Sequence, residues 1–514
     1  MPNLKALIIG AGPTGMTAAI ELRRAGLDVR IIDKATHLAD RSQALVVQSR
    51  TLEQFQRYGI AQTVVGRGRP LRGSRLISEG REIAHLTLDM VPSRYPYTLF
   101  IPQSETEAIL NEHMESLGAI TERGIELQSL TQHSDGATAK LQHPDGQLEE
   151  VSARWILGCD GAHSTVRQLA NIPFIGGGSN LSFFLGDLYL EGADIPKDEL
   201  RIHLHRGDLV FLGPLTDKLT RVIVARQEDE GKDPSEDRPL TLEDFQRAAD
   251  ECGVKIRVLG SEWMTPFHVN DRQARHYRSG DIFLAGDASH IHSPVGGQGM
   301  NTGIQDVANL CWKLAATTRG AADPEKLLDS YEEEREAVGK ALLSFTERGL
   351  KLTTAASPLL VKLRDALLPH LTTMSAVQKG FAGFISETAI EYRSSPIVQD
   401  HGGDGDLRAG DRMPDPDIKS ENGGHTTLLG DWTDTRHLVI AMDATEQVKA
   451  DLASALSHAR VIALRAEDLD SEGGRLFGRQ PKLLIVRPDG YIGFRGPLEQ
   501  SNGWQAYARQ DALL

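Results

Sequence analysis

Residues 6–15 of the chain read Ala-Leu-Ile-Ile-Gly-Ala-Gly-Pro-Thr-Gly, and this stretch decides the fold class. Its unbroken apolar run is typical of a strand that is buried on both faces of a parallel sheet. Gly10, Gly12 and Gly15 follow at the spacing of a dinucleotide fingerprint. Their missing side chains permit a tight turn, close approach of a pyrophosphate and close packing of a helix on the strand.

A helix is predicted to follow this turn. Pro13 and Thr14 lie at its start, where the N-terminal amides of a helix can bind phosphate. The helical pattern continues from residue 16 to residue 25 and ends at Gly26, a residue type typical of helix C-termini.

Residues 29–32 form the second strand and complete a β-α-β unit. Asp33 ends this strand about 20 residues after the fingerprint, where a carboxylate can accept hydrogen bonds from ribose hydroxyls. Lys34 follows it and is a further candidate contact. The unit predicts a Rossmann-like dinucleotide site, but it does not distinguish FAD from NAD.

Two later segments separate these two cofactors. Residues 158–167 read Gly-Cys-Asp-Gly-Ala-His-Ser-Thr-Val-Arg, and residues 280–290 read Gly-Asp-Ile-Phe-Leu-Ala-Gly-Asp-Ala-Ser-His. With the fingerprint, they resemble the class A flavoprotein monooxygenases, the single-component aromatic hydroxylases, and most closely the phenol hydroxylase and polyketide hydroxylase branch. The resemblance covers residues 1–345 through these motifs and extends more loosely to the C-terminus.

The resemblance implies roles for individual residues in binding FAD. Asp287 would hold the ribityl chain, since a carboxylate offers two acceptor oxygens to hydroxyl groups. The helix that begins near Gly299 would direct its N-terminus at the flavin ring, which carries negative charge when reduced. The other cofactor-binding residues that it implies are Gln103, Asp160, Gly161, Pro294, Gly297, Met300 and Asn301.

One segment departs from the family pattern. The family commonly has Ser-Arg-Ala before an Arg-Thr-Leu-Glu helix start, and the arginine is a usual FAD contact. Here Gln43 stands at the arginine position, and Arg41 lies two residues upstream. Arg41 and Gln43 are therefore alternative candidates for this contact.

The resemblance also implies the chemistry. NADPH or NADH would reduce the flavin, dioxygen would add at flavin carbon 4a, and the resulting hydroperoxide would hydroxylate a phenolic or polyketide-like ring. Because the cofactor carries out the difficult step, no catalytic side chain is predicted. The protein is expected to hold the aromatic substrate in a dry cavity, covered by the β-rich residues 175–275.

Other functions stay open at this stage. The same flavin intermediate would support a Baeyer–Villiger oxidation or an epoxidation. A protein that binds flavin and sequesters a ligand without turnover is an alternative of another class. A flavin-dependent halogenase is set aside, because its Trp-x-Trp-x-Ile motif is missing from the sequence.

Two histidine pairs are weighed as candidate functional groups. His203 and His205 lie two residues apart on a predicted strand, and ordinary sheet packing is favoured over action on a substrate phenol. For His290 and His292, inside the flavin motif, structural hydrogen bonds are favoured over acid–base catalysis. Neither pair has enough partners to predict a metal site.

The predicted architecture is α/β, with a Rossmann-like FAD-binding domain over residues 1–175 and an inserted β-sheet substrate domain over 176–275. Residues 276–400 return to the FAD-binding domain and continue as helices, interrupted at Pro358 and Pro369. Residues 405–514 resemble the thioredoxin-like C-terminal domain of the phenol hydroxylase branch. This part lacks Cys-x-x-Cys, so it is interpreted as structural or as an oligomer contact, which leaves a homodimer open.

Local patterns add three elements. Residues 51–58 and 104–117 are predicted as helices, since each begins at Ser or Thr with a Glu in the first turn. Asp145-Gly146 is predicted as the turn of a hairpin within residues 135–157.

Bulk composition restricts the partners. The 514 residues carry a formal net charge of −15, which disfavours nucleic-acid binding, since that function usually leaves a basic surface. Cys159, Cys252 and Cys311 are far apart, so we expect reduced thiols in a cytoplasmic protein. We find no signal peptide and no run of 18 apolar residues that would predict a membrane span.

Overall fold

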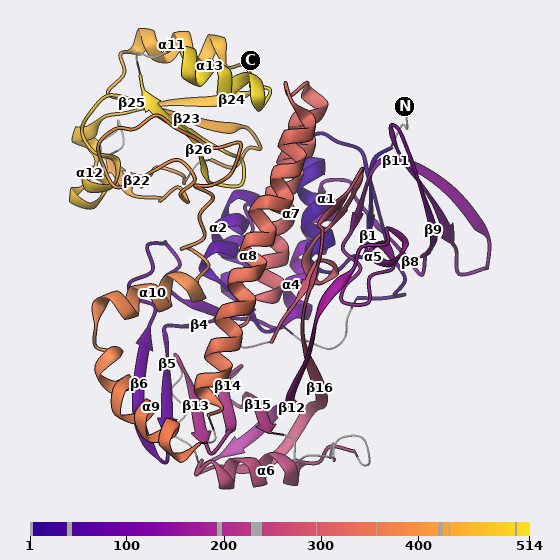
Figure 1. Cartoon of the computed structure of the whole chain (residues 1–514), viewed down its shortest axis with the longest axis vertical. Helices are drawn as coiled ribbons and strands as arrows, with labels where there is room; N and C mark the ends of the chain where they lie inside the picture. Colours follow the sequence, from indigo (N-terminus) through magenta and orange to yellow (C-terminus); the bar gives the residue numbers. More distant parts are fainter. Residues whose placement is uncertain are drawn as a thin grey trace.

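The structure is a computed structural model that describes residues 4–38, 44–192, 198–227, 239–293, 296–355, 357–419, 425–430, 432–498 and 501–513. Within these residues the chain forms two eight-stranded sheets, one five-stranded sheet and two smaller sheets. The five-stranded sheet and the second eight-stranded sheet lie at opposite ends of the molecule (Figure 1). Between them, helix α8 (Pro324–Thr353) runs beside α7 (Gly299–Arg319).

The first eight-stranded sheet contains the predicted β-α-β unit. β1 (Leu4–Ile9) pairs in parallel with β2 (Val29–Asp33) on one side and with β11 (Leu148–Gly158) on the other. The side chains of β1 from residue 6 to residue 8 are fully buried, which confirms that the strand is covered on both faces. Helix α1 (Pro13–Arg24) connects β1 to β2.

Further elements surround this unit. The two predicted helices are confirmed as α2 (Ser49–Tyr58) and α4 (Gln103–Ser116). The predicted hairpin is confirmed by β10 (Gly136–Gln142) pairing antiparallel with β11, and the Gly146 amide closes its turn on the His143 carbonyl at 2.9 Å. The shorter elements are β3 (Val46–Val47), α3 (Ala61–Arg67), β4 (Arg69–Leu71), β7 (Thr98–Phe100), β8 (Thr121–Arg123), β9 (Glu126–His133), α5 (Thr165–Leu169), β17 (Arg278–Ser279), β18 (Ile282–Leu284), a 3-10 turn (Gly286–Ala288) and β19 (His290–Ile291).

The second eight-stranded sheet is built on two long antiparallel strands, β12 (Phe174–Glu191) and β16 (Arg257–Ala274). Its remaining elements in this region are β13 (Glu199–His205), β14 (Asp208–Pro214), β15 (Leu219–Gln227) and α6 (Leu242–Glu251).

Two strands of this sheet come from outside the predicted substrate region. β5 (Gly73–Ser78) pairs in parallel with β13, and β6 (Arg81–Thr87) pairs with β5. Residues 73–87 fall within the predicted FAD-binding domain. Their partner strand lies more than 100 residues away in the sequence, and no local pattern predicts such a pairing.

The helical region differs from its prediction at one proline. Pro358 begins α9 (Pro358–Leu371) as expected for a helix start, but Pro369 lies inside this helix and does not interrupt it. Pro369 is in the last turn, where the proline removes a single backbone hydrogen bond close to the fraying end. α10 (Ser375–Ile385) follows, and both helices lie against β6.

The C-terminal part contains the five-stranded sheet. Its strand β23 (His437–Met442) lies between β25 (Lys482–Val486) and β24 (Ala459–Leu464) and is buried along its whole length. The other elements are β20 (Gln399–Asp400), β21 (Asp417–Lys419), β22 (His425–Thr427), α11 (Glu446–Ala455), a 3-10 turn (Ala466–Asp468), α12 (Ser471–Phe477), β26 (Ile492–Pro497) and α13 (Ser501–Gln510). Helices α11 and α13 lie on one side of this sheet (Figure 1).

Candidate cofactor and substrate site

The fingerprint turn leaves open space at one glycine and close contacts at two others. A Cβ on Gly10 would clash with the Cys159 carbonyl, and a Cβ on Gly15 would clash with the Gly10 carbonyl. In contrast, no atom of the described residues lies within 4 Å of the position that a Cβ on Gly12 would take. The turn is therefore packed against β11 on one side and open above Gly12, at the N-terminus of α1, which is where a pyrophosphate could approach.

Asp33 holds the fingerprint turn in place. Its Oδ2 accepts a hydrogen bond from the Ala11 amide at 2.6 Å, and its Oδ1 accepts one from the Ala35 amide at 2.7 Å. The carboxylate is half-buried, and two oxygens offer more acceptor sites than these two bonds use. It can thus order the turn and still receive a ribose hydroxyl. Lys34 is exposed beside it.

Asp160 binds the N-terminal end of α5 through its carboxylate. Its carboxylate accepts hydrogen bonds from the amides of Thr165 (2.7 Å) and Val166 (3.1 Å) and from the Ser164 hydroxyl (2.6 Å). Burial raises its pKa above the ordinary value, against these hydrogen bonds. Gly161 has a φ of +78°, with no atom within 4 Å of a Cβ position. The carboxylate thus orders the segment while the backbone at Gly161 borders open space.

Asp287 lies beside the N-terminus of α7. Its Oδ1 is 4.0 Å from the position of a Cβ on Gly299, the first residue of α7. The side chain is accessible to solvent, yet protein surrounds it on enough sides for desolvation to raise its pKa. No side chain caps the first turn of α7, so its amides and the Asp287 carboxylate border the same region.

The fingerprint, the turn before Asp287 and α7 meet at Thr14. A Cβ on Gly286 would lie 2.7 Å from the Thr14 Oγ1, and a Cβ on Gly303 would lie 2.5 Å from it. Only glycine at both positions permits α7 and the turn before Asp287 to approach the fingerprint this closely. Arg167 links the remaining motif, because it donates to the carbonyls of Ala288 (2.9 Å) and Ala162 (2.8 Å).

The side chain of Asn301 connects two chain segments at the flavin motif. Its Oδ1 accepts from the Gln48 amide at 2.8 Å, and its Nδ2 donates to the carbonyls of Val46 (2.9 Å) and Gly297 (2.8 Å). Met300, the neighbouring residue, is half-buried. These bonds give Asn301 a structural role in ordering the segment ahead of α7.

Other predicted site residues have different surroundings. Gln103 accepts a hydrogen bond from the Ala44 amide at 2.9 Å and donates to Glu107 at 2.7 Å. Arg41, Gln43 and Pro294 lie outside the residues that the structure describes.

A buried ionic network behind Asp287 was not predicted. Asp306 accepts hydrogen bonds from the Gly286 amide (3.0 Å), His290 (2.9 Å) and Arg335 (2.7 Å). Burial opposes its ionisation, but the charges of Arg335 and His290 lower the pKa of Asp306 to about 2. The network fixes the turn before Asp287. Asp306 lies seven residues after Gly299 on the same helix, and residues at this spacing share a helix face. This spacing is the signal from which the sequence could have identified Asp306.

The histidines are held in structural positions. His292 donates a hydrogen bond from Nδ1 to the Ser293 carbonyl at 2.8 Å, and burial lowers its pKa to about 4. His203 is buried in β13, and burial followed by the charge of Arg201 lowers its pKa to about 4. His205 pairs with Glu79 at 3.0 Å. Among the residues that the structure describes, no group of His, Cys, Asp or Glu could hold a metal ion.

An apolar cluster adjoins the flavin motif on the side of the second sheet. Phe100 stacks on Phe211 of β14 with ring centroids 6.4 Å apart, and Leu45 and Leu71 complete the buried part of the cluster. Val46 packs against this cluster, and its Cβ lies 2.8 Å from a Cβ position on Gly297. These side chains could form one wall of a pocket for a flat apolar ring beside the cofactor.

Comparisons with known proteins match both the N-terminal and the C-terminal parts of the chain. The family described as FAD binding domain matches residues 3–346, and the family described as aromatic-ring hydroxylase, C-terminal, matches residues 406–513. The chain is 33% identical to 6-methylpretetramide 4-monooxygenase of Streptomyces rimosus, over 99% of this chain and 93% of that protein. It is 30% identical to pentachlorophenol 4-monooxygenase of Sphingobium chlorophenolicum, over 99% of this chain and 92% of that protein.

A solved structure supports the same relationship. The anhydrotetracycline hydroxylase OxyS of Streptomyces rimosus superimposes with a TM-score of 0.81 at 31% identity, over 98% of each chain. No helix within the described residues has the length and apolar character needed to cross a membrane.

Proposed function

Because the chain belongs to the FAD-dependent aromatic-ring hydroxylases, we propose that its substrate is a phenolic or polyketide-like ring held against the apolar cluster around Phe211. The chain is a monooxygenase that uses FAD, with NADPH or NADH as the reductant typical of its family. When bound, FAD supplies the activation of dioxygen. One observation carries the proposal: segments from three parts of the sequence converge at Thr14, next to the accessible Asp287 carboxylate.

The proposed cofactor contacts follow from the open spaces at this convergence. The backbone at Gly12 and the N-terminal amides of α1 would receive the pyrophosphate, and Asp33 would receive a ribose hydroxyl. Asp287 would accept from the ribityl hydroxyls. The N-terminus of α7 would stabilise negative charge on the reduced ring, because a helix N-terminus favours an anion.

The substrate class rests on the apolar cluster and on the named relatives. Their names specify a tetracycline-type polyketide substrate in one case and a chlorinated phenol in the other. His203 is the only histidine of β13 that is buried, and burial lowers its pKa to about 4, which makes it a weak proton acceptor for a substrate phenol. Positioning by apolar contact and exclusion of water is therefore the part that we assign to the protein.

An absorbance spectrum and an assay of NADPH and NADH oxidation test this function. We expect flavin bands, oxidation stimulated by phenols or polycyclic polyketides, and a product that gains one oxygen atom. Asp287→Ala should purify with little FAD, and Gly12→Val should block the pyrophosphate position. A wild-type protein that cannot be loaded with FAD would refute the proposal.

The alternatives predict other products. A ring-expanded ester or lactone would indicate a Baeyer–Villiger oxidation, and an oxirane would indicate epoxidation. Tight binding of polycyclic ligands without any ligand-stimulated oxidation of NADPH or NADH would indicate sequestration.

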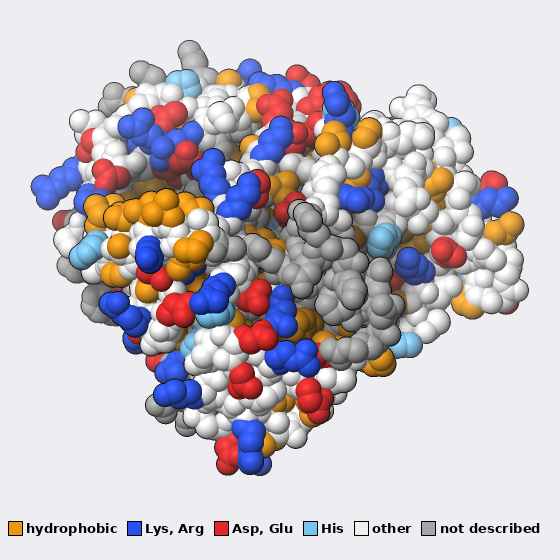
Figure 2. All heavy atoms as spheres, turned by 60° about the horizontal axis from the view of Figure 1, so that its bottom comes forward, with side chains coloured by type: hydrophobic (Ala, Val, Ile, Leu, Met, Phe, Trp, Pro, Cys, Tyr) orange, Lys and Arg blue, Asp and Glu red, His pale blue; other side chains and the backbone are white. Residues whose placement is uncertain are grey.

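We further propose that the enzyme is a cytoplasmic homodimer that uses the outer surface of α9 and α10. Seven large apolar side chains on and between these helices are 36% to 76% exposed: Leu359, Leu360, Leu363, Leu367, Leu371, Met374 and Val377. Hydrophobic side chains gather at the left of Figure 2, the side on which α9 and α10 lie in Figure 1. A group of exposed apolar side chains on one face of a folded protein marks an interaction surface.

Sedimentation velocity of the FAD-loaded protein tests this surface. We expect a dimer that dissociates when Leu363→Glu and Leu367→Glu are combined. Ile120→Glu is the matched control, since Ile120 is 70% exposed elsewhere and should leave the dimer intact. A monomeric wild-type protein at micromolar concentration would contradict the assignment.

A further inference from the structure

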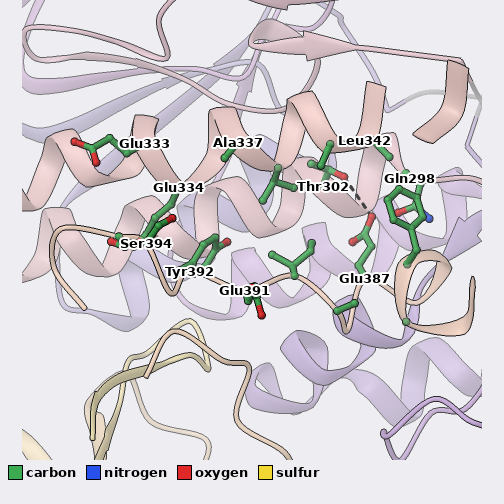
Figure 3. Close-up of a pocket in the computed structure, with 17 residues that line it drawn as sticks. Gln298, Thr302, Glu333, Glu334, Ala337, Leu342, Glu387, Glu391, Tyr392 and Ser394 are labelled. Atoms are coloured by element: carbon green, nitrogen blue, oxygen red, sulfur yellow. Dashed lines mark hydrogen bonds between the residues drawn. The ribbon is translucent and has the colours of Figure 1, made fainter. Parts of the chain in front are cut away.

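A cavity of about 320 Å³ lies outside the proposed cofactor and substrate site. It is lined by α7, by α8, by the C-terminal end of α10 and by residues 387–395, and it opens to solvent beside the exposed Ala337 and Ala341 of α8 (Figure 3). Its volume is at the lower end of the range of about 300–1,000 Å³ that is usual for small-molecule pockets.

The cavity borders a different face of α7 from the face that packs on the fingerprint. Gln298 and Thr302 line the cavity, whereas Gly303 contacts Thr14. Residues four apart share a helix face, and neighbouring residues are rotated by about 100° at 3.6 residues per turn. A molecule in the cavity would therefore contact the first turn of α7 without occupying the cofactor position.

Small side chains create this space. Ala337 and Ala341 lie one turn apart on α8, and Gly383 faces them from α10. The apolar walls are completed by Val338, Leu342, Phe384 and Ile390. A long side chain at either alanine would fill the cavity, which gives a direct way to close it.

Glu387 supplies the polar group at one end of the cavity. It is 3% exposed, and its carboxyl accepts hydrogen bonds from the Thr302 hydroxyl at 3.2 Å and from the Gln305 amide. Burial raises its pKa from 4.5 to about 8, despite the opposing charge of Arg335. A protonated carboxyl has one O–H donor, and no hydrogen bond from Glu387 to an acceptor is found among the described residues.

The backbone at Glu387 is also unusual. Its φ is +60°, a conformation that side chains other than glycine rarely adopt. Glu387 follows Ser386, the C-cap residue of α10, and a left-handed residue at this position commonly ends a helix. The helix end thereby fixes the position of the Glu387 carboxyl in the lining of the cavity, beside Thr302.

We propose that the cavity binds a compact, neutral, largely apolar alcohol or ketone, whose oxygen accepts a hydrogen bond from Glu387. This site is independent of the proposed substrate pocket. At about 20–30 Å³ for each non-hydrogen atom, the cavity accommodates about ten to fifteen such atoms.

The charges around the cavity exclude an anionic ligand. Glu333, Glu334 and Glu391 line it, and Asp306 acts on Glu387 from α7. Arg335 faces the same region from α8, but its guanidinium is already bonded to Asp306 and Tyr392. Because the described lining offers no positively charged side chain to pair with a ligand, a carboxylate or phosphate would be repelled by the glutamates.

The first test uses 4-fluorobenzyl alcohol as the probe and the FAD-loaded enzyme as the receptor. We expect fluorine resonance broadening in solution and probe density beside Glu387 in soaked crystals. Ala341→Phe should reduce the affinity at least tenfold, while flavin absorbance and NADPH oxidation stay unchanged. Ala453→Phe, at an exposed alanine of α11, is the matched control and should bind like the wild type.

Equal binding by Ala341→Phe and Ala453→Phe would overturn the proposal, as would probe density only at the flavin. Loss of flavin from the Ala341→Phe variant would show that the cavity is not separate from the cofactor site, which also overturns it.

The second test separates Glu387 from the apolar walls. The wild-type affinity should fall about tenfold between pH 7 and pH 9, because about a tenth of a group with a pKa near 8 stays protonated at pH 9. Glu387→Gln should bind the probe with no such pH dependence, since the amide keeps a donor and does not titrate. A pH-independent wild-type affinity would refute the role of Glu387.

Discussion

Two buried glutamates, Glu334 and Glu387, lie at opposite ends of one cavity and have opposite electrostatic surroundings (Figure 3). Each is 3% exposed. Glu334 accepts hydrogen bonds from Arg487 at 2.7 and 2.9 Å and from Lys313 at 2.9 Å. Glu387 accepts hydrogen bonds only from neutral groups among the described residues.

The hydrogen-bonding and charged groups around each carboxyl, and not its degree of burial, determine whether it is ionised. Burial raises the pKa of both residues. At Glu334 the charges of Arg487 and Lys313 outweigh burial and hold the pKa well below its usual range. At Glu387 the more distant charge of Arg335 does not outweigh burial. The comparison teaches that a buried acid needs a cation in direct contact to stay ionised.

The ionised end of the cavity, at Glu334, also holds the C-terminal sheet against the rest of the molecule. Arg487 and Asp489 follow strand β25, and Asn309 of α7 donates to Asp489 at 3.1 Å. Glu334 belongs to α8, so one cluster joins two helices to the C-terminal part. The neutral end, in contrast, joins Glu387, which follows α10, to Thr302 and Gln305 of α7 through hydrogen bonds from neutral groups.

The largest expected effect comes from removing the charge of Glu334. Glu334→Gln leaves Arg487 and Lys313 buried with one neutralising carboxylate fewer. Breaking a buried ion pair in this way costs about 3–5 kcal/mol. Urea unfolding of the FAD-loaded enzyme at pH 7 should show this loss of stability.

Glu333→Gln is the matched control for this prediction, because Glu333 is an exposed neighbour on the same helix. It should change the stability by less than about 0.5 kcal/mol. Equal stability of the two variants would mean that the buried cluster does not fasten the C-terminal part.

The second prediction concerns pH. Glu387 has a folded-state pKa of about 8, above the ordinary 4.5 that it takes in the unfolded chain. Its stabilising contribution is therefore complete below pH 4.5 and is lost as the pH rises to about 8. Over this window the wild type should lose about 1.4 kcal/mol per pH unit relative to Glu387→Gln.

Urea unfolding of the two proteins in parallel between pH 5 and pH 9 measures this difference. The contribution of other titrating groups cancels when the two curves are subtracted. Parallel curves across the whole range would show that Glu387 is ionised in the folded enzyme, like Glu334.

The first β-α-β unit could be predicted from the sequence because its signals are local. The apolar run of β1, the spacing of Gly10, Gly12 and Gly15, and the end of α1 at Gly26 each fall within a few residues. The same holds for the helices α2 and α4. Periodicity and turn chemistry act at short range, so one stretch of sequence contains the whole signal.

The buried carboxyls at the two ends of the cavity, Glu334 and Glu387, could not be predicted from the sequence, because the contacts that define them are not local. Glu334 and Arg487 are 153 residues apart, and a charged residue in a helical pattern is ordinarily assigned to a solvated face. Glu387 follows α10 with no motif around it. The pairing of β5 with β13 was missed for the same reason.

The smallest expected effect comes from Thr302, which donates the hydrogen bond at the neutral end. Thr302→Val keeps the shape and removes the hydroxyl, which should cost about 1 kcal/mol at pH 6. Because that hydrogen bond lowers the pKa of Glu387, its removal should raise the pKa further and extend the decline in stability above pH 8. Thr317→Val is the control on the same helix, since the Thr317 hydroxyl bonds only to the Lys313 carbonyl, and it should leave the pH profile of stability unchanged. If both variants shift that profile equally, the neutral state of Glu387 depends on burial alone and not on the hydroxyl that faces it.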